Sequence, residues 1–536
     1  MTSLSYSTVG ASQFTIDFAA QRQSLAPLFN NNADLQSLAQ VRAGQGASRR
    51  RLDDLCRQAF GTLPISPAQE QQLAALASTS SVVAITGQQV GFLGGPLYTV
   101  LKIASTVAAA RQLSEQLGRQ VIPMFWLEDN DHDAAEAGTA TMPDVAGNAV
   151  TVRLWDGDPE RKAVYRRTVS AHDVQRAQQA AELLHGQCAN AATERIRAAY
   201  YEGASWSDAM MSMLYPYLAH WGVLALRGSH VIASGMHGPI IRAQAERPGG
   251  MAAQVAQHDA MLESLGYKPQ ASVGDYPFFV EVDGMRHRPI ADAAGVRVGG
   301  EQWTHERLVD VVTSQPSRCS PGVLLRPVLQ DALLPSIVNV VGGAEAAYHA
   351  QLDNTYRAQG VERPLVWLRH SATIIDQRTQ RLMAKSGLTL QDVLRPLADV
   401  ERDAVAAAAS NVIPDVEQRP LLEEWREAAA TIDPTLQGAV AAAEAAIGKA
   451  LEQLAGKMRS ALKRKHAEQL DRVRTVAGTV YPTETLQERV TPMSWFEARL
   501  GYDTFRKIAE AITAHDRDSH HVVVDEQATL LAEGTP

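Results

Sequence analysis

The stretch SVVAITGQQVGFLGGPLYTVLK, residues 81–102, passes from an apolar run through four glycines into a helical pattern and ends on Lys102. Residues 82–86 are apolar or β-branched, which is typical of a strand buried on both faces. Pro96 then stands where the first turn of a helix tolerates proline, because the missing N–H costs nothing there. The apolar residues that follow at helical spacing are Leu97, Val100, Leu101, Ala104, Val107 and Ala108. The stretch therefore predicts a strand, a loop and a helix.

A second apolar run at residues 121–127, VIPMFWL, follows this helix and predicts the next strand. A strand–helix–strand unit of this kind closes right-handed with its strands parallel. Residues 222–227 and 364–369 are further strand candidates, and the latter run follows a helical stretch around 344–359. We therefore expect an α/β fold with a parallel sheet whose strands are interrupted by insertions.

Long helical segments rich in Ala, Glu, Lys and Arg occupy residues 373–475. One of them carries an apolar stripe at coiled-coil spacing, formed by Ile447, Leu451, Leu454, Met458 and Leu462. Breakers at 413–415 and 433–435 divide the region into at least three helices, as in an antiparallel hairpin. The stripe is interpreted either as a dimer contact or as a surface that packs against its own domain.

A chain of 536 residues exceeds what one ordinary hydrophobic core holds, so several domains or large insertions are expected. The expected segments are a core at 1–149, a first insertion at 150–215, core at 216–266, a second insertion at 267–330, core at 331–375, a helical coiled-coil domain at 376–475, and a C-terminal segment at 476–536 that returns to the core.

The composition of the chain argues against several classes of function. The formal charge of −9 gives no global attraction to nucleic acid or to an anionic membrane. No apolar run is long enough to span a bilayer, and the N-terminus lacks a secretory signal, so we expect a cytoplasmic protein. The three cysteines are widely separated and form no CxxC pair, which argues against a disulfide framework or a structural zinc. The classes of function that remain are chemistry on small molecules and binding to other proteins.

The glycine-containing loop is a candidate anion site. A loop that leaves a parallel strand and opens a helix presents backbone N–H groups and the positive helix end at the carboxyl edge of the sheet. Gln88 and Gln89 add side-chain amides, and Lys102 lies roughly 9 Å along the helix from Pro96, within reach of the mouth. The spacing matches neither GxxxxGK[ST] nor GxGxxG, so turn glycines and a solvated lysine are the alternative interpretation.

The next predicted strand ends in WLEDNDHDAAE, which gathers acids around His132 at the same sheet edge. Clustered carboxylates raise one another's proton affinity and orient a histidine, which suits general acid–base catalysis or the binding of an ammonium group. A divalent metal or a merely solvated acidic loop are alternatives. Further along the chain, two patches set polar groups among apolar residues, namely Arg326, Gln330 and Asp331, and then Glu345, Tyr348 and Gln351.

Six blocks in this order resemble the bacillithiol-synthesis BshC family of cysteine-adding enzymes over nearly the whole chain. They are ITGQQVGFLGGPLYTVLK, VIPMFWLEDNDHD, LLRPVLQDALLP, EAAYHAQL, HSATIID and the terminal QERV. The resemblance implies a Rossmann-like core related to class I aminoacyl-tRNA synthetases and nucleotidyltransferases, with two connecting-peptide insertions and a coiled-coil domain that forms a homodimer. It also implies a ligase that joins cysteine through an amide bond to glucosaminyl-malate, the last step of bacillithiol assembly. Its nucleotide, ADP, is associated with a pocket beside the coiled coil, so ATP or ADP is the expected cofactor, and no metal is assigned.

The resemblance carries site residues over position by position. The catalytic candidates are His132, Asp131, Asp133 and Lys102. The substrate-binding candidates are Thr86, Gly87, Gln88, Gln89, Gly91, Gly95, Tyr98, Thr99, Arg326, Gln330, Asp331, Glu345, Tyr348 and Gln351. Two positions depart from the family pattern: Asn130 replaces a glutamate, and Val341-Gly342-Gly343 replaces Gly-Gly-Pro.

These assignments give a mechanistic hypothesis. An acid is first activated, commonly as an acyl-adenylate. In this hypothesis the helix start at Pro96 and Lys102 stabilise the anionic charge, and Asp131 or Asp133 binds an ammonium group. His132 transfers a proton, and Arg326 binds a malyl carboxylate. Two other functions are retained, an adenylate-forming nucleotidyltransferase that acts on another small acid and a nonenzymatic nucleotide-sensing dimer. Nucleic-acid and membrane partners are not expected.

Overall fold

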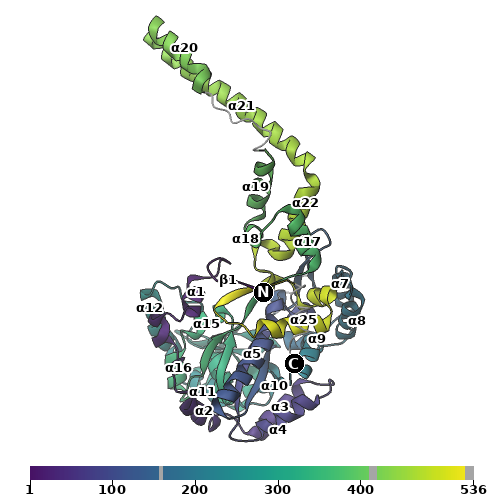
Figure 1. Cartoon of the computed structure of the whole chain (residues 1–536). Coiled ribbons are helices and arrows are strands. Elements are labelled where there is room, and N and C mark those ends of the chain that lie inside the picture. The colour runs from purple at the N-terminus through teal and green to yellow at the C-terminus, as the bar shows by residue number, and fades with distance from the viewer. Residues whose placement is uncertain (156–160, 410–418, 525–536) are drawn as a thin grey trace. The chain divides into compact units, whose positions relative to one another are not determined.

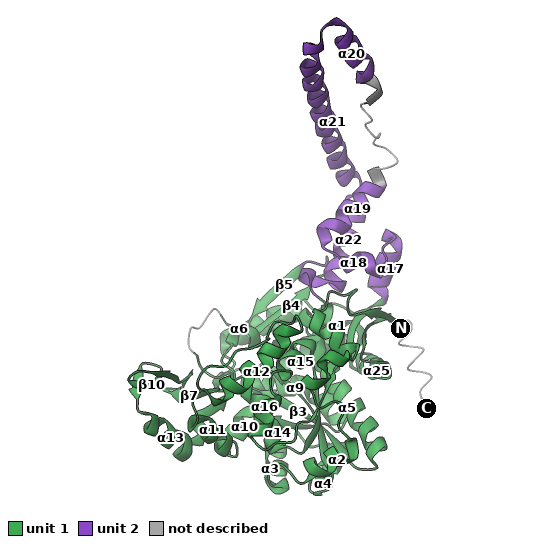
Figure 2. Cartoon of the chain, turned by 90° about the vertical axis from the view of Figure 1, so that its left-hand side faces the viewer, with its two compact units in different colours: residues 1–144, 149–376, 486–536 green, residues 145–148, 377–485 purple. Residues whose placement is uncertain are grey.

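The computed structural model describes residues 1–155, 161–409 and 419–524 of the chain. The chain divides into two compact units (Figure 2). Unit 1 comprises Met1–Asp144, Ala149–Asp376 and Leu486–Pro536, and unit 2 comprises Val145–Asn148 and Gln377–Thr485. In the part of the chain that is described, no helix combines the length and the apolar character that crossing a membrane demands.

A five-stranded parallel sheet forms the centre of unit 1 (Figure 1). Its strand order is β14 (Leu365–Leu368), β13 (Ser336–Val341), β2 (Val82–Gln89), β3 (Val121–Glu128) and β6 (Leu224–Arg227). The predicted strands at 82–86, 121–127, 222–227 and 364–369 are all present. The first is longer than predicted, because β2 pairs with β3 as far as Gln89 opposite Glu128. Gly87, Gln88 and Gln89 are therefore strand residues and not loop residues.

Strand β13 lies in the middle of the sheet and was not predicted. All six of its residues are buried, but Asn339 interrupts its apolar run, SIVNVV. The amide of Asn339 donates to Asp331 Oδ2 at 2.8 Å and accepts from Gln330 Nε2 at 2.9 Å. A buried polar side chain is tolerated when its hydrogen bonds are made, and here the partners come from the preceding helix, α14 (Leu325–Leu333).

Helices cover both faces of the sheet. Alternate residues of β2 point to opposite faces, so Val82 and Ala84 pack with α5 (Leu97–Leu117) and α2 (Leu35–Ala43). Val83 and Ile85 pack on the other face with α3 (Arg49–Ala59), α4 (Pro67–Leu76) and α14. The sheet is consequently apolar on both sides, and polar groups concentrate at its carboxyl edge.

Smaller elements follow the core strands. After β3, the hairpin of β4 (Thr139–Pro143) and β5 (Ala149–Arg153) precedes the helices α7 (Ala171–Glu182), α8 (Ala189–Ala199) and α9 (Trp206–His220). Before β13 come two three-stranded sheets. One contains β7 (Phe278–Val282), β8 (Met285–His287) and β12 (Cys319–Pro321), and the other contains β9 (Ile290–Asp292), β10 (Gly295–Val298) and β11 (Glu301–Trp303). The expected division of this region into core and insertions stays a prediction.

The two ends of the described chain meet in a separate three-stranded sheet. Strand β16 (Ser519–Val524) lies between β1 (Thr2–Ser5), with which it pairs antiparallel, and β15 (Ser371–Ile375), with which it pairs parallel. Three helices lead to β16, namely α23 (Gln487–Val490), α24 (Met493–Leu500) and α25 (Tyr502–Ile512). Helix α23 packs against α5 and β15, which places the QERV motif next to the core.

Unit 2 is helical. It contains α17 (Gln377–Ser386), α18 (Leu390–Val393), α19 (Leu397–Ala409), α20 (Arg419–Ile432), α21 (Gln437–Lys465) and α22 (Ala467–Val480). Helices α20 and α21 pack together and are separated at the predicted breaker 433–435, whereas the breaker at 413–415 lies outside the described residues. Leu462 of the apolar stripe is buried, but Ile447 and Leu454 remain 40% and 53% exposed. The described residues of unit 2 therefore leave these two positions of the stripe partly uncovered.

Candidate active-site cleft

A cleft of about 500 Å³ opens at the carboxyl ends of β2, β3 and β13. Ten charged side chains line it, the bases Lys102, Arg286, Arg288, Arg326, Arg369 and Arg489 and the acids Glu128, Asp131, Glu136 and Glu345. The other predicted site residues in its wall are Gly87, Gln88, Gln89, Tyr98 and Tyr348. Half of the eighteen predicted site residues, counting Lys102, Asp131, Arg326 and Glu345, therefore share one cleft.

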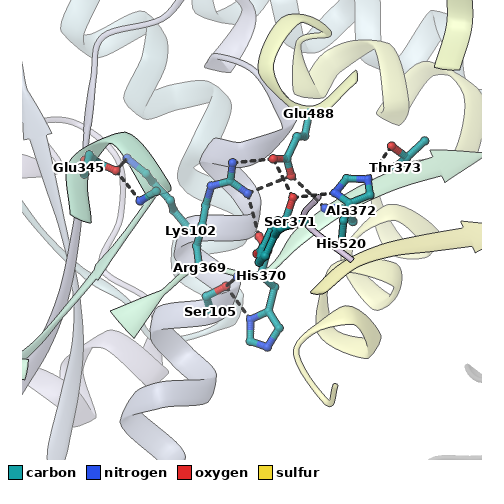
Figure 3. Close-up of polar contacts among 12 residues, drawn as sticks. Lys102, Ser105, Glu345, Arg369, His370, Ser371, Ala372, Thr373, Glu488 and His520 are labelled. Atoms are coloured by element: carbon teal, nitrogen blue, oxygen red, sulfur yellow. Dashed lines mark hydrogen bonds and ion pairs between the residues drawn. The ribbon is translucent and has the colours of Figure 1, made fainter. Parts of the chain in front are cut away.

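Lys102 is buried in the floor of this cleft and makes a full set of hydrogen bonds. Its Nζ donates to Gly87 O at 2.9 Å and to Gln88 Oε1 at 3.0 Å. It also lies 2.6 Å from Glu345 Oε2, as Figure 3 shows for this pair. An ammonium group has three N–H donors, so these partners use all of them. Burial lowers the pKa of Lys102 although Glu345 opposes this shift. The expected contact of Lys102 with a substrate anion is thus replaced by an internal ion pair.

Glu345 combines two roles at the start of α15 (Gly343–His349). Its Oε2 accepts the N–H of the N-cap residue Gly342 at 2.7 Å, and the same carboxylate pairs with Lys102. Burial alone would raise its pKa, but the charge of Lys102 and the hydrogen bonds keep the pKa of Glu345 below its ordinary value. The pair fixes the end of β13 against α5.

Asp131 reaches the cleft and is held there by two neighbours. Its Oδ2 accepts from Gln89 Nε2 at 2.8 Å, and its Oδ1 lies 3.3 Å from Arg286 Nη1. Burial opposes ionisation, but hydrogen bonds from His132 and the charge of Arg286 hold the pKa of Asp131 well below its usual range. Asp131 is therefore an ionised carboxylate that can bind an ammonium group.

His132 does not line the cleft, which contradicts the expectation that it faces Gln88 and Lys102. Its Nδ1 lies 3.3 Å from Asp131 Oδ1 and 3.2 Å from Arg286 Nη1, and its Nε2 lies 3.0 Å from Arg161 Nη2. A guanidinium only donates, so Nε2 can accept from Arg161, while Nδ1 lies between an acceptor, Asp131, and a second donor, Arg286. Both ring nitrogens are then occupied, so this structure gives His132 a positioning role.

Asp133 is likewise outside the cleft. Its Oδ1 accepts the N–H of Glu136 at 2.9 Å and caps the short helix α6 (Ala134–Ala137). Glu136 itself does line the cleft, and burial together with the charges of Asp133 and Asp131 raises its pKa. The expected ammonium ligand at Asp133 is corrected to a helix cap.

The second half of the glycine loop holds another part of the chain instead of a ligand. The N–H of Leu97 donates to Thr491 O at 2.9 Å, and the N–H of Met493 donates to Gly95 O at 3.0 Å. A Cβ on Gly91 would come within 2.8 Å of Gly95 Cα, so the turn needs glycine for space. At the helix start the N–H of Leu97 is thus used by a neighbouring segment of the chain, and the expected anion site there stays a prediction.

Two threonines of the predicted set are structural as well. Thr86 Oγ1 donates to Val340 O at 2.7 Å and ties β2 to β13, while Thr99 is fully buried in α5.

Gln330, Asp331 and Gln351 belong to the core behind the cleft, not to its lining. Asp331 is fully buried and accepts hydrogen bonds from Ser336, Asn339, Tyr356 and Gln330. Gln351 donates to Asp259 and bonds the backbone of Ala271 through both its oxygen and its nitrogen. These networks satisfy buried polar groups, so the predicted substrate contacts of the three residues are corrected to structural ones.

Four arginines of the cleft were missed by the sequence analysis. Arg286 and Arg288 follow β7 in the chain, Arg369 follows β14, and Arg489 belongs to α23. Two of them carried a signal: Arg489 stands in the QERV block, and Arg369 is the last residue of the predicted strand 364–369. The predicted Arg326 donates to Gln330 Oε1 at 3.0 Å and to the Tyr348 hydroxyl at 3.2 Å.

Comparison with known proteins identifies the family. The model described as Bacillithiol biosynthesis BshC, N-terminal Rossmann-like domain matches residues 1–370, and the model of the C-terminal coiled-coil domain of BshC matches residues 372–525. The chain belongs to the bacillithiol biosynthesis BshC family. Its fold class is thus the expected Rossmann-like core with a coiled-coil domain.

Three relatives that align with most of the chain carry the name "Putative cysteine ligase BshC". The protein of Salinibacter ruber is 28% identical over 466 residues, 84% of each chain. That of Geobacillus kaustophilus is 28% identical over 90% of this chain and 91% of its own, and that of Koribacter versatilis is 28% identical over 92% and 93%.

The two departures from the BshC pattern have local physical reasons. The N–H and the side-chain amide of Asn130 both lie 3.2 Å from Glu128 Oε1, so a carboxylate at position 130 would face a second carboxylate. A Cβ on Gly343 would overlap Thr15 Oγ1, so the turn before Glu345 has no room for a side chain there. Glycine at position 343 thus keeps the turn in which Glu345 accepts the N–H of Gly342.

A metal was not assigned from the sequence. Within the described ranges, no group of three or more His, Cys, Asp or Glu side chains is arranged to hold an ion.

Proposed function

We propose that this chain is a ligase that joins L-cysteine to glucosaminyl-malate through an amide bond, the last step of bacillithiol assembly. Membership of the BshC family and relatives named as cysteine ligases support the reaction class. The observation that carries the proposal is the mixed charge of the cleft, six bases and four acids at one sheet edge. Such a cleft has partners both for a dicarboxylate and for an ammonium group.

The malyl end of the substrate carries two carboxylates, which arginine forks recognise. Arg288 and Arg489 are exposed at the cleft, and Arg326 lies in its wall. We assign one malyl carboxylate to Arg326 and place the other in the part of the cleft lined by Arg369 and the exposed pair. The ammonium group of cysteine is assigned to Asp131, which is ionised and faces the same space.

Amide formation from a free carboxylate requires activation. We infer that the cysteine carboxylate attacks the α-phosphorus of ATP, which forms cysteinyl-adenylate and releases pyrophosphate. The glucosamine nitrogen then attacks the acyl carbon, the C–N bond forms, AMP leaves with the electrons of the acyl–oxygen bond, and the nitrogen loses a proton. Glu136 is our candidate acceptor of that proton, because it lines the cleft and its pKa is raised.

ATP enters this proposal as a third substrate, and ADP as the nucleotide that the family resemblance implies. We also propose a cytoplasmic location, where ATP is available, and a homodimer formed through the coiled-coil domain. The exposed apolar residues Ile447 and Leu454 on α21 support the dimer.

The decisive experiment incubates the purified chain with cysteine, glucosaminyl-malate and ATP and identifies the products by mass spectrometry. We expect the amide product together with AMP and pyrophosphate. Pyrophosphate without amide would favour a nucleotidyltransferase, and nucleotide binding without turnover would favour a sensor. Arg326→Gln should abolish most of the activity, while Arg381→Gln, an exposed position on α17, serves as the matched control.

A further inference from the structure

Arg369 enters the cleft from the end of β14 and is only 7% exposed. Its Nη1 donates to Glu488 Oε2 at 2.9 Å and to His370 O at 2.8 Å, and its Nη2 donates to Glu488 Oε1 at 2.6 Å (Figure 3). This two-pronged contact fixes the plane of the guanidinium more tightly than a single ion pair would.

Glu488 also accepts hydrogen bonds from two residues that do not line the cleft. Besides Arg369, its Oε1 accepts from Ser371 Oγ at 2.9 Å and its Oε2 accepts from the N–H of Ala372 at 2.9 Å. The carboxylate is 1% exposed. Four donors in fixed positions leave Glu488 one orientation, and this orientation determines that of Arg369.

The next link comes from the C-terminal strand. His520 of β16 places Nδ1 2.7 Å from Ser371 Oγ and Nε2 2.9 Å from Thr373 Oγ1. Ser371 gives its one hydroxyl proton to Glu488, so it must accept from His520, which therefore carries its proton on Nδ1. Thr373 then donates to Nε2. The result is a chain of hydrogen bonds directed from Thr373 through His520 and Ser371 to Glu488, which also accepts the two hydrogen bonds from Arg369 (Figure 3).

Arg369 keeps donors for a ligand. A guanidinium has five N–H groups, and its contacts with the described residues use three of them, which leaves Nε–H and one Nη2 hydrogen. A Cβ built on Gly342, a residue of the cleft wall, would lie 3.9 Å from Arg369 Nε, so this nitrogen borders the cleft. Adjacent Nε and Nη2 hydrogens match the two oxygens of a carboxylate.

We propose that Glu488, oriented through Ser371 by His520 of the C-terminal strand, is a positioning residue that presents Arg369 to a carboxylate of the substrate. The identification of that carboxylate as malyl rests on the proposed function. Glu488 and His520 touch no substrate in this proposal; they act through Arg369. The alternative is a buried ion pair that only stabilises the fold.

Binding of carboxylate ligands separates the two roles. Calorimetry measures the affinity of the full-length chain for malate, for glucosaminyl-malate and for methyl glucosaminide, which lacks the malyl carboxylates. We expect Glu488→Gln to weaken malate and glucosaminyl-malate binding at least tenfold and to leave methyl glucosaminide unchanged. Arg369→Gln should do the same, and the double variant should bind no worse than Arg369→Gln, because both changes remove one interaction.

The His520 variants provide a test that does not depend on the charge of Glu488. Asn places a side-chain N–H close to the position of His Nδ1, so His520→Asn should retain malate affinity while His520→Leu weakens it. A thermal unfolding scan of each variant confirms that the protein tested is folded, and if Glu488→Gln is unfolded, the His520 pair decides alone.

Three results would overturn the proposal: wild-type protein that binds no malate, folded Glu488→Gln or His520→Leu with unchanged malate affinity, or effects of Glu488→Gln and Arg369→Gln that simply add. None of these depends on amide formation. Absence of amide product with malate binding retained would instead count against the proposed function alone.

Discussion

Nζ of Lys102 lies 2.6 Å from Oε2 of Glu345, and this ion pair joins the helix after the first core strand to the turn after β13. The two residues are far apart in the sequence and both line the cleft. The other two N–H groups of Lys102 donate to Gly87 and Gln88, so the same side chain also fixes the end of β2. The wall of the cleft is therefore organised by a structural pair whose charges cancel.

Removing one partner of this pair should cost more than removing both. Lys102→Met leaves Glu345 without its cation, and a broken buried pair typically costs about 3–5 kcal/mol of unfolding free energy. The double variant Lys102→Met, Glu345→Gln should recover part of that loss, because no unpaired charge remains. Denaturant unfolding of the four proteins measures both effects. Equal losses for the single and double variants would contradict this account.

Ionisation of Glu488 should make the unfolding free energy of unit 1 depend on pH in the acid range. The charge of Arg369 and the hydrogen bonds lower the pKa of Glu488 to about 2 in spite of burial. A lowered pKa means that the stabilisation is complete above the unfolded-state value of about 4.5 and is lost as the pH falls through 2. The shift corresponds to about 3 kcal/mol at neutral pH.

The check is urea unfolding between pH 7 and pH 2. Wild-type protein should lose stability steeply below pH 4.5, while Glu488→Gln should be less stable at pH 7 and have a flatter profile in that range. Glu424→Gln, at an exposed position of α20, is the control that should keep the wild-type profile. Parallel profiles for wild type and Glu488→Gln would rule out the ionised Glu488.

Sequence patterns predicted the core of this fold where the signal is local. The β2–α5–β3 unit follows from an apolar run, a proline at a helix start and helical spacing, all within a few turns of chain. Strand β13 was not predicted, because a polar residue, Asn339, interrupts its apolar run. Asp331 and Gln330 offset the cost of burying Asn339 through hydrogen bonds, and their positions are known only from the tertiary structure.

The site was predicted in part for the same reason. The carboxyl edge of the sheet and Lys102, Asp131 and Arg326 could be inferred from strand ends and residue chemistry. Whether a polar side chain faces the cleft or the core depends on partners elsewhere in the chain, such as Thr491 opposite the helix start and Arg161 beside His132. Arg286 and Arg288 stand in no motif, so no pattern pointed to them, whereas Arg369 ends the predicted strand 364–369 and was overlooked.

His132 should prove to be a positioning residue. We expect His132→Asn to retain at least about a tenth of kcat, because an amide can still bond Asp131 or Arg161 and the reacting atoms are not touched. Removal of a general acid or base typically costs about 10²–10⁴-fold. Steady-state kinetics with a kcat–pH profile makes the distinction, and a loss of a hundredfold or more with the disappearance of a titrating limb would restore the catalytic role.

Gly343 should tolerate no side chain. A Cβ there would overlap Thr15 Oγ1, and both residues belong to packed helices, α15 and α1 (Gln13–Ala19). We expect Gly343→Ala to lower the unfolding free energy by about 1–3 kcal/mol, the usual cost of overpacking. Adding Thr15→Ala should restore part of it. Gly274→Ala, where a new Cβ meets nothing within 4 Å, is the matched control. Unchanged stability of Gly343→Ala would show that Thr15 can move aside freely.

The apolar stripe of α21 should form the dimer contact. Ile447 and Leu454 are seven residues apart, one heptad, and remain 40% and 53% exposed, as expected of a seam that needs a second helix. A glutamate at Leu454 would bury a charge in that seam, so Leu454→Glu should raise the dimer dissociation constant at least tenfold, and adding Ile447→Glu should raise it further. Gln453→Glu adds the same charge at the neighbouring exposed position and should leave the dimer intact. Sedimentation velocity over a concentration series measures all four proteins. A wild-type monomer at every concentration, or equal weakening by Gln453→Glu, would mean that the stripe is not the contact.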